Sequence, residues 1–348
     1  MGIKRLLYFA YYVKRLDWKL FRRFLRHARE HTGRSCPRIV CDALISSFRY
    51  NISILEYFQF RFFDLDDDNR KTYAGTGYMY EYQLAMNPKS ERSVLDNKLM
   101  FYEVYRPLIR RMVVSLDDLR HDRSLKGRLQ RAGEGKVVLK YSRGKCGKQV
   151  KILEDKAIEE MDLAKYMANH GSDLAEEYVI QHPDLMALSP SGVNTVRIIT
   201  QLTSGNGVDL LGVRLRVTVN SAVDNMAAGN FAATVDPISG VVDGPGVYSD
   251  ITRADVSVHP VTGVRVQGFK IPFWAETLSL AKQAALMSTG NRSVGWDIAI
   301  TQSGPELIEG NHDWCKLLWQ MPAKRGMKKT LDRYLAELKS NRRVEVVR

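Results

Sequence analysis

The chain has 348 residues, of which 45% are hydrophobic and 26% are charged, and its formal net charge is +13. This composition excludes a disordered or fibrous protein, and the length predicts two or three lobes. No apolar run approaches the roughly 18 residues of a transmembrane helix, and the four cysteines form no C-x-x-C pair. We therefore expect a cytoplasmic protein without disulfides or a zinc site. The positive charge predicts an acidic partner, which could be nucleotide, nucleic acid, anionic lipid or an acidic sugar.

Residues 1–35 are strongly basic. Their lysines and arginines alternate with aromatic and aliphatic residues at helical spacing, which predicts amphipathic helix. Such a helix could lie on an anionic membrane surface with its aromatic side chains toward the lipid. It could equally pack on the protein itself, with its basic side chains in water. Nucleic-acid binding is not favoured, because no recognised nucleic-acid motif accompanies the segment.

Residues 36–90 mix apolar stretches with an acidic run, Asp64-Leu-Asp-Asp-Asp68. The run lacks the glycine and the terminal glutamate of an EF-hand loop, so we interpret it as a solvated loop. No strand–glycine–helix unit appears, and a dinucleotide fold is therefore not supported. Beyond this segment Lys98 opens an amphipathic helix, and taken alone this lysine is an ordinary exposed one.

Residues 135–153 have the pattern of a β-hairpin with a glycine-rich tip. Two β-rich runs flank a loop that contains Gly144, Gly147 and several basic residues. Backbone N–H groups and ammonium charges at such a tip can bind phosphates. The loop is not a Walker A loop, because the G-x-x-x-x-G-K-[ST] spacing is absent. Lys140 ends the first strand, where a lysine can reach from the sheet to a nucleotide.

Further strands follow. Residues 176–183 indicate a strand with two acidic residues at its start, and residues 193–200 indicate a strand that places Thr195 and Arg197 on one face. The run 210–217 alternates similarly and contains Arg214 and Arg216. A polar loop, residues 224–230, comes next.

The hairpin pattern at residues 294–311 carries the most chemistry. Asp297 starts an apolar run, a Ser-Gly-Pro turn follows, and a second apolar run leads to Glu309 and Asn311. Side chains alternate along a strand, so Glu309 and Asn311 point the same way, and Asp297 can face the same spot from the neighbouring strand. Two carboxylates and an amide oxygen suit Mg²⁺ shared with phosphate oxygens. The alternative is a solvated hairpin that carries polar residues by chance, and the flanking apolar runs count against it.

Taken in this order, the motifs resemble those of ATP-grasp enzymes. The amino-acid sequences of the motifs are most similar to those of the ATP-grasp proteins associated with sugar transfer and polysaccharide gene clusters. The resemblance runs from about residue 95 to 325. Its phrases are Glu177-Tyr-Val-Ile-Gln-His-Pro183, Asn194-Thr-Val-Arg-Ile198, Val223-Asp-Asn225 with Gly229, His259-Pro-x-Thr-Gly263, and Gly295-Trp-Asp297 with Glu309-Gly-Asn311. One departure is Asn230, which stands where a second glycine is usual.

The resemblance implies an α+β fold in which two lobes clamp a nucleotide. A mainly helical basic region precedes these lobes in the chain. We expect that region at residues 1–90, the small lobe with its hairpin and hinge at 91–182, the large lobe with the metal site at 183–325, and a basic tail at 326–348. For ATP, the implied contacts are Lys98, Lys140, Gly144 and Gly147 at the phosphates, and Glu177, Val179, Ile180 and Gln181 at the adenine. The implied catalytic residues are Arg197, Arg214 (with Arg216 as a close rival) and Asn225. The implied Mg²⁺ ligands are Asp297, Glu309 and Asn311.

The function that the resemblance implies is an ATP-dependent carboxylate–amine ligase, working through an acyl phosphate. Its substrates would be a uronic acid or another sugar acid of a surface polysaccharide, and an amine. Two alternatives stay open. One is a phosphotransferase on the same scaffold, and the other is a non-enzymatic basic protein that binds membrane or nucleic acid through residues 1–35. The expected location is the cytoplasm. If residues 1–35 bind lipid, the protein would be associated with the inner face of the membrane.

Overall fold

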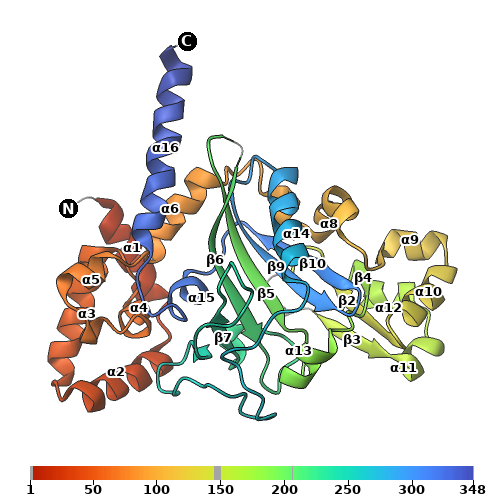
Figure 1. The fold of residues 1–348 in the computed structure, drawn as a ribbon, viewed down its shortest axis with the longest axis horizontal. Coiled ribbons are helices and arrows are strands. Elements are labelled where there is room, and N and C mark those ends of the chain that lie inside the picture. Colours follow the sequence, from red (N-terminus) through yellow and green to blue (C-terminus); the bar gives the residue numbers. More distant parts are fainter. Residues whose placement is uncertain (1–2, 145–149, 206, 348) are drawn as a thin grey trace.

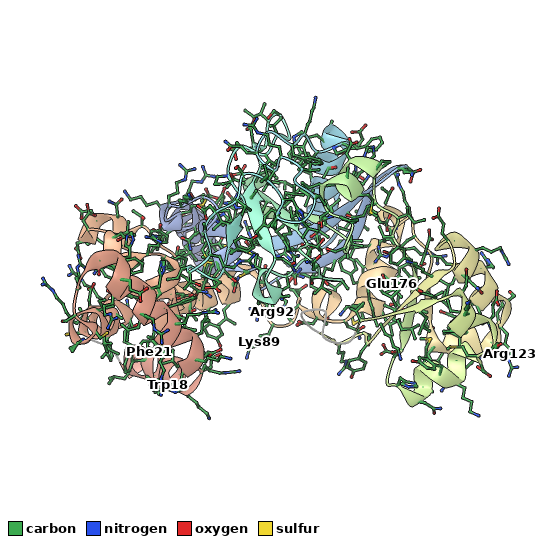
Figure 2. The ribbon with its side chains drawn as sticks, turned by 90° about the horizontal axis from the view of Figure 1, so that it is seen from below. Trp18, Phe21, Lys89, Arg92, Arg123 and Glu176 are labelled. Carbon is green, nitrogen blue, oxygen red and sulfur yellow. The ribbon has the colours of Figure 1, made fainter. Side chains whose placement is uncertain are left out.

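The computed structural model describes residues 3–144, 150–205 and 207–347. Helices of the N-terminal region lie at one end of the molecule, a large antiparallel sheet occupies the centre, and a smaller sheet with its own helices lies at the other end (Figure 1). Figure 2 shows the same arrangement, with Trp18 and Phe21 on the N-terminal helices and Arg123 at the far end of the small lobe. The α+β class that the sequence predicts is confirmed.

The N-terminal region is helical, as predicted, and encloses an aromatic core. Its elements are α1 (Ile3–Lys14), α2 (Trp18–Thr32), α3 (Cys36–Tyr50), α4 (Ile54–Gln59), η1 (Phe62–Asp64), α5 (Asp67–Lys71) and α6 (Thr76–Met86). Phe24, Tyr57 and Phe58 are buried together in this core. The prediction of a solvated loop at the acidic run was wrong in part. Asp66 caps α5, because its carboxylate accepts a hydrogen bond from the Asn69 backbone N–H at 2.8 Å.

The small lobe is a four-stranded antiparallel sheet backed by helices. The strand order is β1-β4-β2-β3, with β1 (Val113–Ser115), β2 (Lys136–Lys140), β3 (Lys151–Glu154) and β4 (Leu174–Glu177). The covering helices are α9 (Leu116–His121), α10 (Ser124–Ala132), α11 (Asp155–Glu159) and α12 (Leu163–Asn169). The predicted hairpin of β2 and β3 is confirmed, whereas the strand predicted for residues 176–183 ends at Glu177.

The large lobe is built on a six-stranded antiparallel sheet of order β10-β9-β5-β6-β7-β8. Its strands are β5 (Thr195–Leu202), β6 (Val208–Val217), β7 (Phe231–Thr234), β8 (Val247–Tyr248), β9 (Ser293–Thr301) and β10 (Gly304–Asn311). Outside the two sheets and the helices already named, the chain forms α7 (Ser93–Asp96), α8 (Lys98–Tyr105), η2 (Arg106–Leu108), α13 (Pro183–Leu188), η3 (Met226–Ala228), α14 (Trp274–Met287), α15 (Lys316–Gln320) and α16 (Lys328–Val347). The predicted hairpin at residues 294–311 is β9 and β10.

The two faces of this sheet serve different purposes. One face, with Val196 and Ile198 among its side chains, packs against α14 in the largest core. The opposite face packs Ile199 and Leu211 against the side chains of α6, α15 and α16. The rest of that second face carries charged residues. Alternation along the strands therefore separates a dry layer from a polar one.

The N-terminal region is tied to the large lobe next to those charged residues. The Lys316 ammonium on α15 lies 2.9 Å from the carboxylate of Glu56 on α4, and both side chains are largely buried. On α2, the Arg23 guanidinium lies 3.0 Å from the Asp250 carboxylate. These contacts make the N-terminal helices part of the same structure as the polar face of the sheet.

Candidate active site

A cavity of about 950 Å³ opens between the two sheets and α2. Its size is in the range of small-molecule sites. The wall includes Lys98, Lys140 and Gly144 on one side and the charged strands of the large sheet on the other. Leu20, Arg23 and Phe24 of α2 complete it. The sequence assigned no role to the N-terminal region here, because nothing in a helical pattern says which distant surface the helix will cover.

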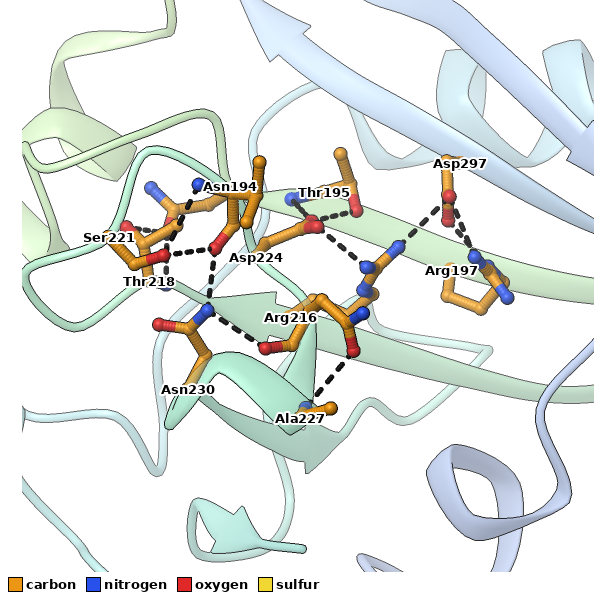
Figure 3. A network of polar contacts seen from close by, with 12 residues as sticks. Asn194, Thr195, Arg197, Arg216, Thr218, Ser221, Asp224, Ala227, Asn230 and Asp297 are labelled. Carbon is orange, nitrogen blue, oxygen red and sulfur yellow. Dashed lines mark hydrogen bonds and ion pairs between the residues drawn. The ribbon is translucent and has the colours of Figure 1, made fainter. Parts of the chain in front are cut away.

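Three neighbouring strands bring opposite charges together on the floor of the cavity. Asp297 on β9 pairs in register with Arg197 on β5. The Asp297 carboxylate accepts hydrogen bonds from Arg197 Nε at 2.5 Å and Nη2 at 2.7 Å, and from Arg216 Nη1 at 2.9 Å (Figure 3). Burial opposes ionisation of Asp297, but the two guanidinium groups outweigh it and lower the pKa of the carboxyl. Asp297 is therefore held as an anion.

Glu309 on β10 faces Asp297 because the pairing of the hairpin is irregular. The register shifts between Leu307 and Glu309, and Glu309 pairs with Asp297 and Asn311 with Gly295. Burial and then the like charge of Asp297 raise the pKa of the Glu309 carboxyl. The Asn311 amide lies 3.2 Å from a Glu309 oxygen. The predicted convergence of Asp297, Glu309 and Asn311 is present.

These three side chains fit a divalent cation. The Asp297 carboxylate is buried and the adjacent Glu309 carboxylate is half-buried. Their like charges repel one another, and a cation between them would remove this repulsion, which adds to burial in raising the pKa of Glu309. The described part of the chain contains no cluster of three or more His, Cys, Asp or Glu side chains that could hold a metal ion. At this site only two ligands are carboxylates, and the third oxygen would come from the Asn311 amide. A cation would share Asp297 with Arg197 and Arg216, since both oxygens of that carboxylate already accept hydrogen bonds.

The polar loop after β6 supports the second arginine. Asp224 accepts hydrogen bonds from Thr195 and lies 2.6 Å from Arg216 (Figure 3). Asn225 lines the cavity, and its side-chain oxygen accepts a hydrogen bond from the Ala227 backbone N–H at 3.0 Å. Asn230, the departure from the family phrase, is fully buried and donates to the carbonyls of Val223 and Asn225. It closes the loop by hydrogen bonds.

Lys98 reaches the start of the glycine-rich loop. Its backbone N–H donates to the Ser142 carbonyl at 2.9 Å, and its ammonium donates to the Gly144 carbonyl at 2.5 Å. Burial lowers the pKa of this lysine, and the nearby Glu309 carboxyl acts in the opposite direction. Gly147 lies outside the described residues.

Lys140 ends β2 inside the same cavity and pairs with a residue that the sequence did not single out. The Lys140 ammonium lies 2.7 Å from the Glu176 carboxylate, which also lies 2.9 Å from Arg111. Burial alone would raise the pKa of Glu176, but Lys140 and Arg111 outweigh burial and lower that pKa to about 2. The sequence pattern indicates Glu177 and does not distinguish Glu176, and no motif marks Arg111.

The segment after β4 divides between the cavity and the core. Glu177 lines the cavity, and its carboxylate accepts a hydrogen bond from the Met112 backbone N–H at 2.8 Å. Val179 also lines the cavity, whereas Ile180 and Gln181 are not among the described residues of its wall. The Gln181 side chain is buried and accepts a hydrogen bond from the Asn194 backbone N–H at 2.7 Å.

Arg214 and Arg216 lie two residues apart on β6 but have different surroundings. Arg216 lines the cavity and pairs with Asp224 and Asp297. Arg214 donates to the Trp319 carbonyl under α15, outside the described wall of the cavity. Burial lowers the pKa of Arg214 to about 10. Arg214 lies opposite Arg197 in the strand register, but it is Arg216 that pairs with Asp297 in the cavity.

Two lobes that enclose a cavity with lysines, arginines and paired carboxylates are the arrangement of the ATP-grasp proteins. The chain belongs to the sugar-transfer associated ATP-grasp family, whose model matches residues 78–335. This match confirms the resemblance seen in the motifs and the ATP-grasp fold. No curated protein matches the chain.

Solved structures of ATP-grasp enzymes are similar to this chain at low identity. The ATP-grasp ligase PsnB, complexed with a minimal precursor, is 13% identical over 72% of this chain and 63% of its own, with a TM-score of 0.43. An L-amino acid ligase from Bacillus licheniformis is 12% identical over 71% and 49% of the respective chains, also with a TM-score of 0.43. A D-alanine–D-alanine ligase from Bacillus anthracis is 14% identical over 73% and 71%, with a TM-score of 0.40. The chain spans less than two thirds of the length of the first two.

Proposed function

We propose that the protein is an ATP-dependent carboxylate–amine ligase that modifies a sugar acid, such as a uronic acid, of a surface polysaccharide or its precursor. The observation that carries the proposal is the convergence of Lys98 and Lys140 with Asp297, Glu309 and Asn311 in one cavity. Membership of the sugar-transfer associated family supports the polysaccharide context. The domain limits expected from the sequence remain part of this proposal.

Each group in the cavity has a task in this reaction. Lys98 and Lys140 bind ATP phosphates, while Glu177 and the backbone near Val179 contact the adenine. Arg197 and Arg216 neutralise the phosphoryl group during transfer, which needs positioning and charge stabilisation more than covalent help from the protein. Asp297, Glu309 and Asn311 would hold Mg²⁺, which when bound would neutralise charge on the phosphate oxygens.

The chemistry takes two steps. An oxygen of the substrate carboxylate attacks the γ-phosphorus, the bond to the β-phosphate oxygen breaks, and an acyl phosphate and ADP result. The amine nitrogen then attacks the acyl carbon, loses a proton and expels inorganic phosphate, which leaves an amide. The cavity between the two sheets and α2 favours the second step, because an acyl phosphate open to water hydrolyses.

Product analysis tests this function. The protein is incubated with Mg-ATP and a panel of uronic acids and amines. We expect ADP release only when both an acid and an amine are present, and mass spectrometry should detect a new amide. Lys140→Met should lose Mg-ATP-induced thermal stabilisation, because a charge on the phosphates is removed. Lys136→Met, on the same strand outside the described cavity wall, is the matched control and should keep it.

Other outcomes of that experiment decide between the alternatives. A stable phosphorylated product formed from an alcohol acceptor would replace the ligase by a phosphotransferase on the same scaffold. Absence of any stabilisation by Mg-ATP in the parent, together with steeply salt-dependent binding to polyanions, would favour the non-enzymatic basic protein.

We also propose that α1 contacts an anionic membrane surface. One side of α1 packs on the protein, since Phe9 stacks on Phe48 at 4.3 Å and Tyr12 is buried. The other side leaves Leu6 61% and Leu7 65% exposed, between basic residues at both ends of the helix. Exposed apolar side chains beside lysines and arginines are typical of interfacial helices. Among the described residues no helix combines the length and apolar character needed to cross a bilayer.

Vesicle flotation checks this contact. The parent should float with phosphatidylglycerol vesicles and not with phosphatidylcholine vesicles. Replacing both Leu6 and Leu7 by serine should weaken binding about tenfold or more, because a fully buried leucine contributes about 1.5–3 kcal/mol. Ile238→Ser removes an apolar side chain that is 88% exposed elsewhere and should change nothing. Equal flotation of all three proteins would refute the contact.

A further inference from the structure

Arg111 lies where the small lobe meets the large sheet, and its guanidinium joins both. In the small lobe, Nε donates to Glu176 on β4 at 2.9 Å. In the large lobe, Nη1 donates to the Glu306 carboxylate on β10 at 2.7 Å. All three side chains are about 5% exposed or less. A buried arginine with two carboxylate partners is held in one geometry, because moving it would leave charges unpaired.

The same guanidinium supports the irregular pairing that aims Glu309. Leu307 pairs with Ile298 and packs in the core against α14, so regular alternation would point Glu309 into that core as well. The register shift at Ile308 reverses this, and Glu309 faces Asp297. Arg111 donates to the carbonyls of the shifted residues, to Leu307 at 2.5 Å and to Ile308 at 3.3 Å.

Through Glu176 the same residue also reaches the lysine of the nucleotide side. Arg111 Nε and the Lys140 ammonium both lie against one oxygen of Glu176, at 2.9 and 2.7 Å. Lys140 is thereby fixed relative to the strand that carries Glu309, although the two residues belong to different sheets. The planar fork of arginine can serve four acceptors at once, which a lysine ammonium cannot do with the same geometry.

We propose that Arg111 is a positioning residue that sets Glu309 for metal and Lys140 for nucleotide phosphates from a single guanidinium. This inference rests on the proposed function, because it assumes that the cavity binds ATP and a divalent cation. It adds a residue of the cavity wall that no motif marks. Its effect on the two ligands should separate, because Glu306 and the bulge carbonyls form one arm and Glu176 with Lys140 the other.

Calorimetry with the β,γ-methylene analogue of ATP tests the metal arm. In Arg111→Lys, Mg²⁺ affinity of the analogue complex should fall about 10- to 100-fold, as expected when support for a metal ligand is lost. Glu306→Gln should weaken Mg²⁺ in the same direction while keeping the Glu176 arm. Arg110→Met is the matched control, since the exposed Arg110 side chain donates to the Ser303 carbonyl, in the turn before β10, at 2.7 Å, and its Mg²⁺ affinity should equal that of the parent.

A double-mutant cycle in EDTA tests the nucleotide arm. The loss of analogue affinity caused by Lys140→Met should shrink about threefold or more in the Arg111→Lys background, because Lys140 is no longer held there. In the Glu306→Gln background the loss should match that in the parent. If the losses of analogue affinity in Lys140→Met and Arg111→Lys are additive and the Mg²⁺ affinity of Arg111→Lys is unchanged, the inference about Arg111 is overturned while the proposed function stands. A folded parent that binds no analogue would overturn the proposed function and this inference with it. Should Arg111→Lys fail to fold, unchanged Mg²⁺ affinity in Glu306→Gln would still overturn the metal arm.

Discussion

Replacing Asp297 by asparagine is expected to lower ATP turnover by at least about 10²–10³-fold, the usual loss when a group that stabilises transferring charge is removed. Asp297 contacts the other charged groups of the site, since Arg197 and Arg216 both donate hydrogen bonds to it and Glu309 faces it. Asparagine keeps the shape but removes the negative charge. The cation would lose an anionic ligand, and both guanidinium groups would lose their shared partner.

Turnover is measured as ADP release at saturating acid and amine, with Mg²⁺ varied. Breaking a buried ion pair can cost about 3–5 kcal/mol of folding stability, so thermal unfolding of the variant is recorded in parallel. Asp224 still pairs with Arg216 in the variant, which limits that loss. Asp313→Asn is the control, because Asp313 is exposed at the cavity wall only two residues beyond Asn311. Parental turnover in folded Asp297→Asn would contradict the assignment of the metal site.

Much of the site could be predicted from the chain because local patterns carry it. The apolar runs around Asp297 and Glu309 and the turn between them are enough to place a hairpin, and strand alternation groups Glu309 with Asn311. The register shift at Ile308 could not be predicted. A bulge is one extra residue stabilised by distant partners, here Arg111, and nothing in Leu307-Ile308 itself marks it.

The rest of the site depends on partners far apart in sequence. Glu176 and Glu177 look equivalent in a strand pattern, yet only Glu176 meets Lys140, because pairing of β2 with β4 decides which side chain faces which. The membership of α2 in the cavity wall likewise depends on how the N-terminal helices dock, through Lys316 and Glu56. Such tertiary contacts lie outside any local pattern.

Replacing Arg216, but not Arg214, is expected to reduce turnover strongly. Both are on one face of β6, so sequence alternation treats them alike, but only Arg216 has carboxylate partners in the cavity. Arg216→Met should reduce turnover about 10²–10³-fold, since a charge beside the transferring phosphoryl group is lost while Asp224 and Asp297 are left facing each other. Arg214→Met should keep turnover near that of the parent.

Stability separates the two variants further. Arg214 is buried, and its Nε has no hydrogen-bond partner among the described residues. Replacing a buried charge without a paired carboxylate by an apolar side chain of similar length is often neutral or stabilising, so Arg214→Met should unfold at the parental temperature or above. Steady-state ADP release and thermal unfolding of both variants check this. Loss of turnover in folded Arg214→Met, with Arg216→Met active, would mean that the phosphoryl group lies under α15, and the cavity between the sheets would then not be where ATP reacts.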